Sequence, residues 1–137
     1  MGHANQKGQI IIATTLSTIV IDGESSDRVL VLDALADRGF RCEAVSSPSE
    51  AAPHLARTDF DAVVVYERAV GDGLCDFVST VRARLPVAAI IVVQTEYDGQ
   101  MECSLFDLDV DDVITCEYSP SLLAGRAALR AKRRLGG

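Results

Sequence analysis

The sequence has no long apolar segment and no excess of basic residues. Its 137 residues contain no apolar run near the roughly 20 that a membrane-spanning helix needs. The apolar stretch near the N-terminus is only "IIIA", with little positive charge before it, so we expect a cytoplasmic protein without a signal peptide. Twenty acidic and thirteen basic residues give a net charge of −7. This charge argues against direct contact with nucleic acid, which requires a basic surface.

Metal-binding and disulfide motifs are also missing. The sequence has four widely spaced cysteines, Cys42, Cys75, Cys103 and Cys116, and no two of them form a C-x-x-C motif. It has only two histidines that could join them as metal ligands. This pattern indicates neither a zinc site nor a disulfide framework. We therefore expect four reduced and partly buried thiols.

Lysine and aromatic residues are scarce. The chain has two lysines and no tryptophan, and aromatic residues make up 5% of it. This acidic, lysine-poor composition resembles that of proteins from salt-loving organisms, a likeness that says nothing about activity. The one basic cluster, "RAALRAKRR" at 126–134, falls at the C-terminal end of a predicted helix, where cations complement the helix dipole. We interpret it as a solvent-exposed helix end.

What the chain does contain is a regular alternation of short β-branched runs and amphipathic segments, in a length suited to one domain. Strands are predicted over 17–22, 40–45, 61–66, 87–93 and 112–116. Helices are predicted over 25–39, 47–58, 74–85, 99–108 and 119–135. Five strands that alternate with five helices through short loops predict an α/β fold with a doubly wound parallel sheet.

The details of this alternation give further expectations. The first helix places Val29, Leu32 and Leu35 at helical spacing, with Ser25 or Ser26 as its cap and Gly39 at its end. The third carries one apolar stripe, and Pro120 begins the last helix. The stripe consists of Leu74, Phe77, Val78, Val81 and Leu85.

Three segments are less regular. Pro53 stands in the middle of the second helix, so it either sits in the first turn or shortens that helix. Residues 1–16 are interpreted as a tail, although "QIII" could add an edge strand, and residues 135–137 as a second tail. The folded domain is therefore expected over 17–134.

In a doubly wound sheet, functional residues gather outside the carboxyl ends of the strands. Four groups of residues follow the predicted strands and are expected at one edge of the sheet. They are Asp22, Gly23 and Glu24 after the first strand, Tyr66, Glu67 and Arg68 after the third, Gln94 and Thr95 after the fourth, and Cys116 and Glu117 after the fifth.

With these strand ends in place, residues 17–134 resemble the receiver domain of two-component response regulators. The family has an acidic pair after its first strand, a phosphorylated aspartate at the end of the third, a Ser or Thr after the fourth and a Lys-Pro after the fifth. The segments that carry the likeness are "STIVIDGESSD", "FDAVVVY", "AIIVVQTE" and "DVDDVITCEYSP". The resemblance implies a flavodoxin-like fold with strand order 2-1-3-4-5.

Carried over by position, the family's site is only partly kept. Asp22 and Thr95 match, whereas Gly23 replaces the second acid unless Glu24 substitutes for it. Tyr66 stands where the phosphoacceptor is expected. Cys116 and Glu117 stand at the lysine and proline positions.

These replacements affect the chemistry that the resemblance implies. The family's acids hold Mg²⁺, which prefers carboxylate oxygens, and its lysine offsets phosphoryl charge. A phenol with a pKa of about 10 is a poor phosphoryl acceptor, and a neutral thiol offsets no charge. Phosphorylation of an aspartate is therefore predicted to be lost, with no cofactor, and Mg²⁺ only if phosphorylation capacity remains. Asp22 is the one weak metal ligand left.

Several residues keep two interpretations. A shift of one residue would bring Glu67 to the acceptor position, but side chains alternate along a strand, so Tyr66 and Glu67 cannot both face the site without a bulge. Thr95 is either a helix cap or a retained switch residue. Asp22 either has a structural role or binds a cation. Tyr66 is expected to pack with its hydroxyl tied to a neighbour, so that it closes the former site.

The preferred hypothesis is a degenerate receiver that acts in signalling as an interaction module and not as an enzyme. The resemblance implies that it binds a protein partner, or a second copy of itself, through the fourth helix, fifth strand and fifth helix. It is either a stand-alone regulator or a piece of a longer protein. One alternative is a phosphorelay receiver that uses Glu67 or Asp22. Another is a nucleotide- or flavin-binding module, against which "DGESSD" lacks a glycine-rich phosphate loop.

Overall fold

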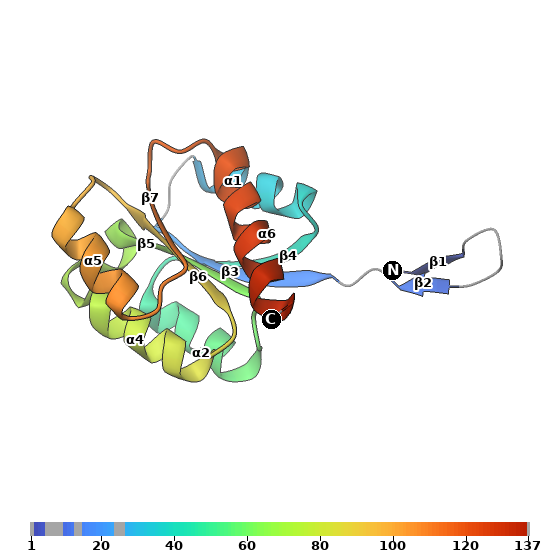
Figure 1. Ribbon diagram of the computed structural model, residues 1–137, viewed down its shortest axis with the longest axis horizontal. Coiled ribbons are helices and arrows are strands. Elements are labelled where there is room, and N and C mark those ends of the chain that lie inside the picture. The colour runs from blue at the N-terminus through green and yellow to red at the C-terminus, as the bar shows by residue number, and fades with distance from the viewer. Residues whose placement is uncertain (1, 5–9, 13–14, 24–26, 137) are drawn as a thin grey trace.

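A central parallel sheet organises the chain, for which the computed structural model describes residues 2–4, 10–12, 15–23 and 27–136 (Figure 1). Its strands are β3 (Leu16–Ile21), β4 (Phe40–Val45), β5 (Ala62–Tyr66), β6 (Ala89–Gln94) and β7 (Asp112–Thr115). They lie in the order β4-β3-β5-β6-β7. Counted along the chain this is 2-1-3-4-5, so the predicted fold class and strand order are confirmed.

Helices cover both faces of this sheet, as Figure 1 shows. One face carries α1 and α6, and the other carries α2, α4 and α5. A short helix, α3, and a 3₁₀ turn, η1, lie between β5 and α4. The bounds are α1 (Asp27–Asp37), α2 (Pro48–Arg57), α3 (Glu67–Val70), η1 (Gly71–Gly73), α4 (Leu74–Arg84), α5 (Gly99–Asp107) and α6 (Pro120–Gly136).

Burial on both faces explains why the central strands have almost continuous apolar sequences. Every residue of β5 and β6 is buried. Because side chains alternate along a strand, Val63 and Val65 pack against the α2, α4 and α5 layer, whereas Val64 and Tyr66 pack against the α1 and α6 layer. The direction in which Tyr66 points is therefore set by the register of a fully buried strand.

Two helices differ in detail from the sequence-based expectations. In α1 the buried residues are Val31 and Leu35, while Val29 is 62% exposed, so the predicted apolar stripe was wrong at that position. In α2 the helix continues through Pro53, with Ser47 as N-cap and Pro48 in the first turn. The missing N–H of a proline leaves one helix carbonyl unbonded, and in α2 this carbonyl lies on an exposed turn where water can bind it.

The two ends of the chain also depart from the expectations. Ile10–Ile12 forms β2, which pairs with β1 (Gly2–Ala4) in a separate antiparallel sheet and adds no edge strand to the five-stranded one. Residues 135 and 136 belong to α6. The predicted caps Ser25 and Ser26 lie outside the described residues, whereas Gly39 has the expected positive φ of 90° after α1. None of the described helices is long and apolar enough to span a membrane.

Candidate functional site

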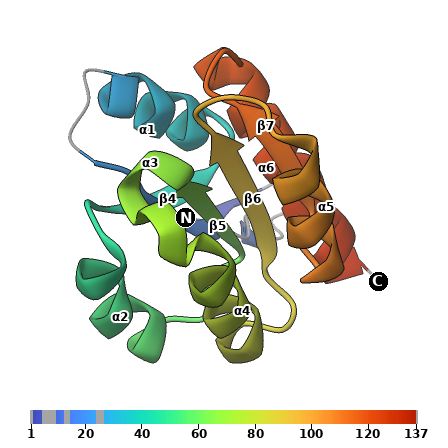
Figure 2. The same ribbon diagram turned by 90° about the vertical axis from the view of Figure 1, so that its left-hand side faces the viewer.

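The carboxyl edge of the sheet brings together most of the predicted site residues. Figure 2 views the molecule from the side on which the strands end, with α3 in front of the sheet. Asp22 follows β3, Tyr66 ends β5, Glu67 begins α3 and Thr95 follows β6. The predicted loop after β5 is thus replaced by a helical turn that starts directly at the strand end, and this turn determines the geometry of the site.

Asp22 is paired with Arg68 of α3. Its carboxylate is 1% exposed and accepts two hydrogen bonds from one guanidinium, at 2.8 Å from Nε to Oδ1 and 2.9 Å from Nη2 to Oδ2. Such bidentate charge-assisted pairs are among the stronger protein hydrogen bonds. The hydrogen bond raises the pKa of Arg68 above its ordinary value. Asp22 is therefore held as a buried carboxylate by a cation of the same chain.

Tyr66 lies under the same guanidinium. The ring is 5% exposed and Arg68 Cζ is 4.8 Å from the ring centroid, a cation–π geometry. Burial, and the negative charge of Asp22 after it, raise the pKa of the Tyr66 phenol to about 12. The expected packing role of Tyr66 is consistent with this position, because its ring is part of the core and is covered by Arg68. Among the described residues the Tyr66 hydroxyl has no hydrogen-bond partner, so the expected bond to a neighbour is not formed there.

Glu67 points toward the other neighbouring strand. Its Oε1 accepts a hydrogen bond from the backbone N–H of Thr95, at 3.1 Å. The Thr95 carbonyl in turn accepts a hydrogen bond from the Cys116 thiol, at 3.2 Å from Sγ to O. A carboxylate, a peptide unit and a thiol thus join α3, the end of β6 and the end of β7. The strand β5 ends at Tyr66 without a bulge. Glu67 is the first residue of α3, so its direction is not set by the alternation of side chains along the strand.

The loop after β6 is anchored by residues other than Thr95. Asp98 is the N-cap of α5, accepting hydrogen bonds from the N–H groups of Gln100 and Met101, so the interpretation of Thr95 as a cap was wrong. The buried Gln94 side chain binds both backbone groups of Asp98, donating to its carbonyl at 3.1 Å and accepting from its N–H at 3.3 Å. Thr95 is exposed at the turn that these contacts create.

The residues present do not fit the family's Mg²⁺ site. Both Asp22 oxygens face a guanidinium, and Gly23 supplies no carboxylate. Within the described residues no three His, Cys, Asp or Glu side chains are grouped to hold a metal ion. Glu24, the proposed substitute acid, lies outside those residues. Glu117 is exposed beside Cys116.

Arg68 is the site residue that the sequence analysis missed. It was noted as following the third strand but was given no role. The available signal was chemical: a lone carboxylate at a buried strand end requires a counter-charge, and Arg68 is the basic residue nearest in sequence to the acceptor position. The resemblance drew attention to other positions.

Comparisons with known proteins agree with this architecture. No protein-family model matches the sequence, and no curated protein matches it. Among solved structures, a response regulator from Thermotoga maritima is 20% identical, with a TM-score of 0.76 over 90% of this chain and 100% of that one. A CheY-like response regulator receiver domain from Methanospirillum hungatei is 10% identical, with a TM-score of 0.81 over 90% and 98%.

A third similar structure is that of an atypical orphan response regulator, described as revealing a phosphorylation-independent regulatory mechanism. It is 19% identical, with a TM-score of 0.75 over 85% of this chain and 96% of that one. At these identities the likeness shows the fold. The chain has the CheY-like receiver fold of response regulators.

Proposed function

We propose that the chain is a receiver that works without phosphorylation, as an interaction module in signal transduction. The observation that carries the proposal is the bidentate pair between Arg68 and the 1% exposed Asp22. In a phosphorylated receiver a metal ion and a lysine would supply positive charge at this edge. Here a guanidinium of the same chain supplies it, and a buried tyrosine ring occupies the acceptor position.

This arrangement fixes the site without an external signal. Arg68 connects α3 to the end of β3, and Glu67 connects α3 to the turn after β6. Both contacts belong to the folded chain and need neither a phosphoryl group nor a metal ion. The proposal is therefore that the conformation of the carboxyl edge is constant, and that regulation comes from the partner or from the amount of protein.

For the binding surface we propose the face formed by α5, the edge strand β7 and α6. Five large apolar side chains lie exposed on these elements or on the turn between β7 and α6, at 37% to 58% exposure: Phe106, Tyr118, Leu122, Leu129 and, at the C-terminal end of α6, Leu135. The first four are assigned to this face. On the same face Arg126 pairs with Asp112 at 3.0 Å and lies over the Tyr118 ring. An apolar surface with paired charges at its side suits a protein partner or a second copy of the chain.

The test is incubation of the chain with acetyl phosphate and Mg²⁺, followed by intact-protein mass measurement. We expect no added phosphate, because the acceptor position holds a phenol under a guanidinium. A labile phosphate on the wild-type chain would contradict the proposal. In that case Glu67→Gln and Asp22→Asn would show whether either alternative carboxylate is the acceptor.

A restored variant serves as the positive control. Gly23→Asp, Tyr66→Asp, Arg68→Ala and Cys116→Lys together return the family's acids and lysine and remove the guanidinium. An added Cβ at Gly23 has no atom within 4 Å, so the new aspartate has space. We expect this variant to gain a base-labile phosphate. The same variant with Tyr66→Phe in place of Tyr66→Asp is the matched control and is expected to gain none.

A further inference from the structure

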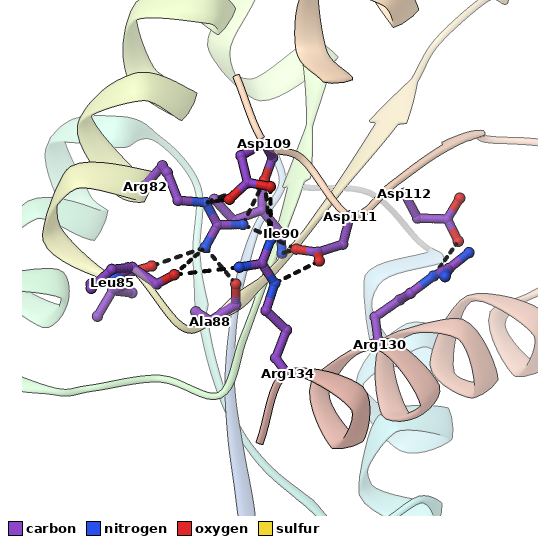
Figure 3. A network of polar contacts seen from close by, with 10 residues as sticks. Arg82, Leu85, Ala88, Ile90, Asp109, Asp111, Asp112, Arg130 and Arg134 are labelled. Carbon is purple, nitrogen blue, oxygen red and sulfur yellow. Dashed lines mark hydrogen bonds and ion pairs between the residues drawn. The ribbon is translucent and has the colours of Figure 1, made fainter. Parts of the chain in front are cut away.

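A basic pocket lies at the edge of the sheet opposite the candidate site. Its cavity of about 460 Å³ is lined by Val87, Asp111, Arg130, Arg133 and Arg134, and we call it the α6 arginine pocket. Val87 precedes β6, Asp111 precedes β7, and the arginines come from the C-terminal half of α6. The sequence predicts a solvated helix end for these arginines, whereas in the structure Arg130 and Arg134 reach back to Asp112 and Asp111 at the edge of the sheet (Figure 3).

The acidic group of the pocket is already fully occupied. Asp111 Oδ1 accepts a hydrogen bond from Arg134 Nε at 2.7 Å. Its Oδ2 accepts from the backbone N–H of Ile90 at 2.8 Å and from Arg82 Nη2 at 3.0 Å (Figure 3). Three donors on two oxygens leave little capacity for a further cation. Asp111 therefore does not neutralise the other arginines of the pocket.

Donors remain in excess on α6. Arg130 Nε is 3.5 Å from Asp112 Oδ2, but the same oxygen already accepts from Arg126 at 3.0 Å. Arg130 Nε is buried and makes no hydrogen bond. Arg133 is exposed and has no ion pair within the part of the chain that the structure describes. Because the Arg130 Nε is buried, an anion would bind the terminal Nη groups of Arg130, whose side chain is 30% exposed, and the guanidinium of Arg133.

The surroundings of the pocket distinguish between kinds of anion. Residues 126–134 carry five cations in a chain of net charge −7, so positive charge is concentrated at this end. Beside it Val87 is 65% exposed and Leu135 is 55% exposed, and they line an adjoining depression of about 380 Å³ whose far side carries Asp59, Asp61 and Arg84. A small inorganic anion would contact only the arginines. A peptide in which acidic and aliphatic residues alternate would cover both.

We propose that the α6 arginine pocket binds an acidic peptide segment of a partner protein. A carboxylate of that segment binds Arg130 and Arg133, and a neighbouring aliphatic side chain packs on Val87 and Leu135. This site lies at the amino ends of β6 and β7 and adjoins the α5, β7 and α6 face along α6, and it does not depend on the loss of phosphorylation.

The experiment is a titration of the full isotope-labelled chain with the acetylated peptide Glu-Leu-Glu-Leu-Glu, followed through the methyl resonances of Val87 and Leu135. We expect both residues to shift and Arg133→Gln to weaken binding about fivefold, the effect of losing one charge-assisted contact at an exposed site. Arg57→Gln removes another exposed arginine, on α2, and is expected to leave the affinity unchanged.

Other outcomes would overturn the proposal. These are the absence of shifts at Val87 and Leu135, an equal loss of affinity in Arg133→Gln and Arg57→Gln, or equal binding of Gln-Leu-Gln-Leu-Gln. A titration with inorganic phosphate separates the two kinds of ligand. If phosphate binds as tightly as the acidic peptide and shifts the same methyl groups, the pocket is a simple anion site and the peptide assignment is wrong.

Discussion

Glu67 and Arg68 are adjacent in sequence, and their side chains bind the two strands on either side of β5. Arg68 pairs with Asp22 at the end of β3, and Glu67 accepts the N–H of Thr95 after β6. Both residues belong to α3, whose four residues begin where β5 ends. One short helix thus connects three strand ends through two opposite charges, so each contact can be removed separately.

Arg68→Ala is expected to lower the free energy of unfolding by about 2–3 kcal/mol. Breaking a buried ion pair costs about 3–5 kcal/mol because a buried charge loses its counter-ion, and the 34% exposure of Arg68 reduces this cost. In an Asp22→Asn background the same change is expected to cost less than about 1 kcal/mol. Urea unfolding of the wild-type chain, the two single variants and the double variant gives both values. Equal costs of Arg68→Ala in the two backgrounds would show that the stabilising effect of Arg68 does not come from its pair with Asp22.

Glu67→Ala is expected to accelerate hydrogen exchange at the Thr95 amide. The N–H loses its only acceptor among the described residues, and one such hydrogen bond is equivalent to about a fivefold change in protection. Glu102→Ala is the matched control, since Glu102 binds the Tyr97 hydroxyl near the same turn without contacting Thr95. Similar exchange at Thr95 in all three chains would refute the role of Glu67.

Tyr66 predicts a loss of stability at high pH. Its folded pKa is raised to about 12, from about 10 in the unfolded chain. A raised pKa favours the folded state fully below pH 10, and this stability, at most about 3 kcal/mol, is lost as the pH rises from about 10 to about 12. We expect the loss to be smaller in Tyr66→Phe. The free energy of unfolding, measured from about pH 9 to about pH 12 for both chains alongside a tyrosinate absorbance titration, tests this prediction. The same pH dependence of stability in the wild type and in Tyr66→Phe would contradict it.

The fold could be predicted because its determinants are local and repetitive. Continuous apolar runs such as β5 and β6 indicate strands covered on both faces, and Gly39 and Pro120 mark helix ends by their backbone chemistry. Val29 was misplaced because α1 has apolar residues on several faces, so periodicity alone does not select the buried one. The two strands before Leu16 depend on pairing with each other, which composition does not show.

The place of the candidate residues in the fold follows from the sequence, whereas their contacts do not. Asp22, Tyr66 and Thr95 were located from strand ends, which parallel topology brings to one edge. The pairing of Arg68 with Asp22 depends on α3 beginning directly after Tyr66. The glycines of the segment "ERAVGDG" favoured a loop there, so the sequence did not indicate this helix. The cap of α5 is Asp98, which precedes Gly99 directly, so a local signal for it was present in the sequence.

Two arginines of α4, Arg82 and Arg84, look alike in the sequence but have different surroundings in the structure. Arg82 is 13% exposed and donates to the carbonyls of Leu85, Ala88 and Asp109, at 3.0, 2.7 and 2.7 Å, and to Asp111 at 3.0 Å (Figure 3). Arg84 is 41% exposed and pairs at 3.0 Å with Asp59, which is 86% exposed.

Replacement of each arginine by alanine is therefore expected to have unequal effects. Arg82→Ala removes a donor from the Asp111 carboxylate and from the carbonyls of Leu85, Ala88 and Asp109, and is expected to cost about 3 kcal/mol. Arg84→Ala removes a surface pair worth less than about 1 kcal/mol. Both changes shorten the same side chain on the same helix, so propensity and charge cancel in the comparison. Urea unfolding measures the difference. Equal losses would mean that the loops before β6 and β7 are held by packing and not by the Arg82 guanidinium.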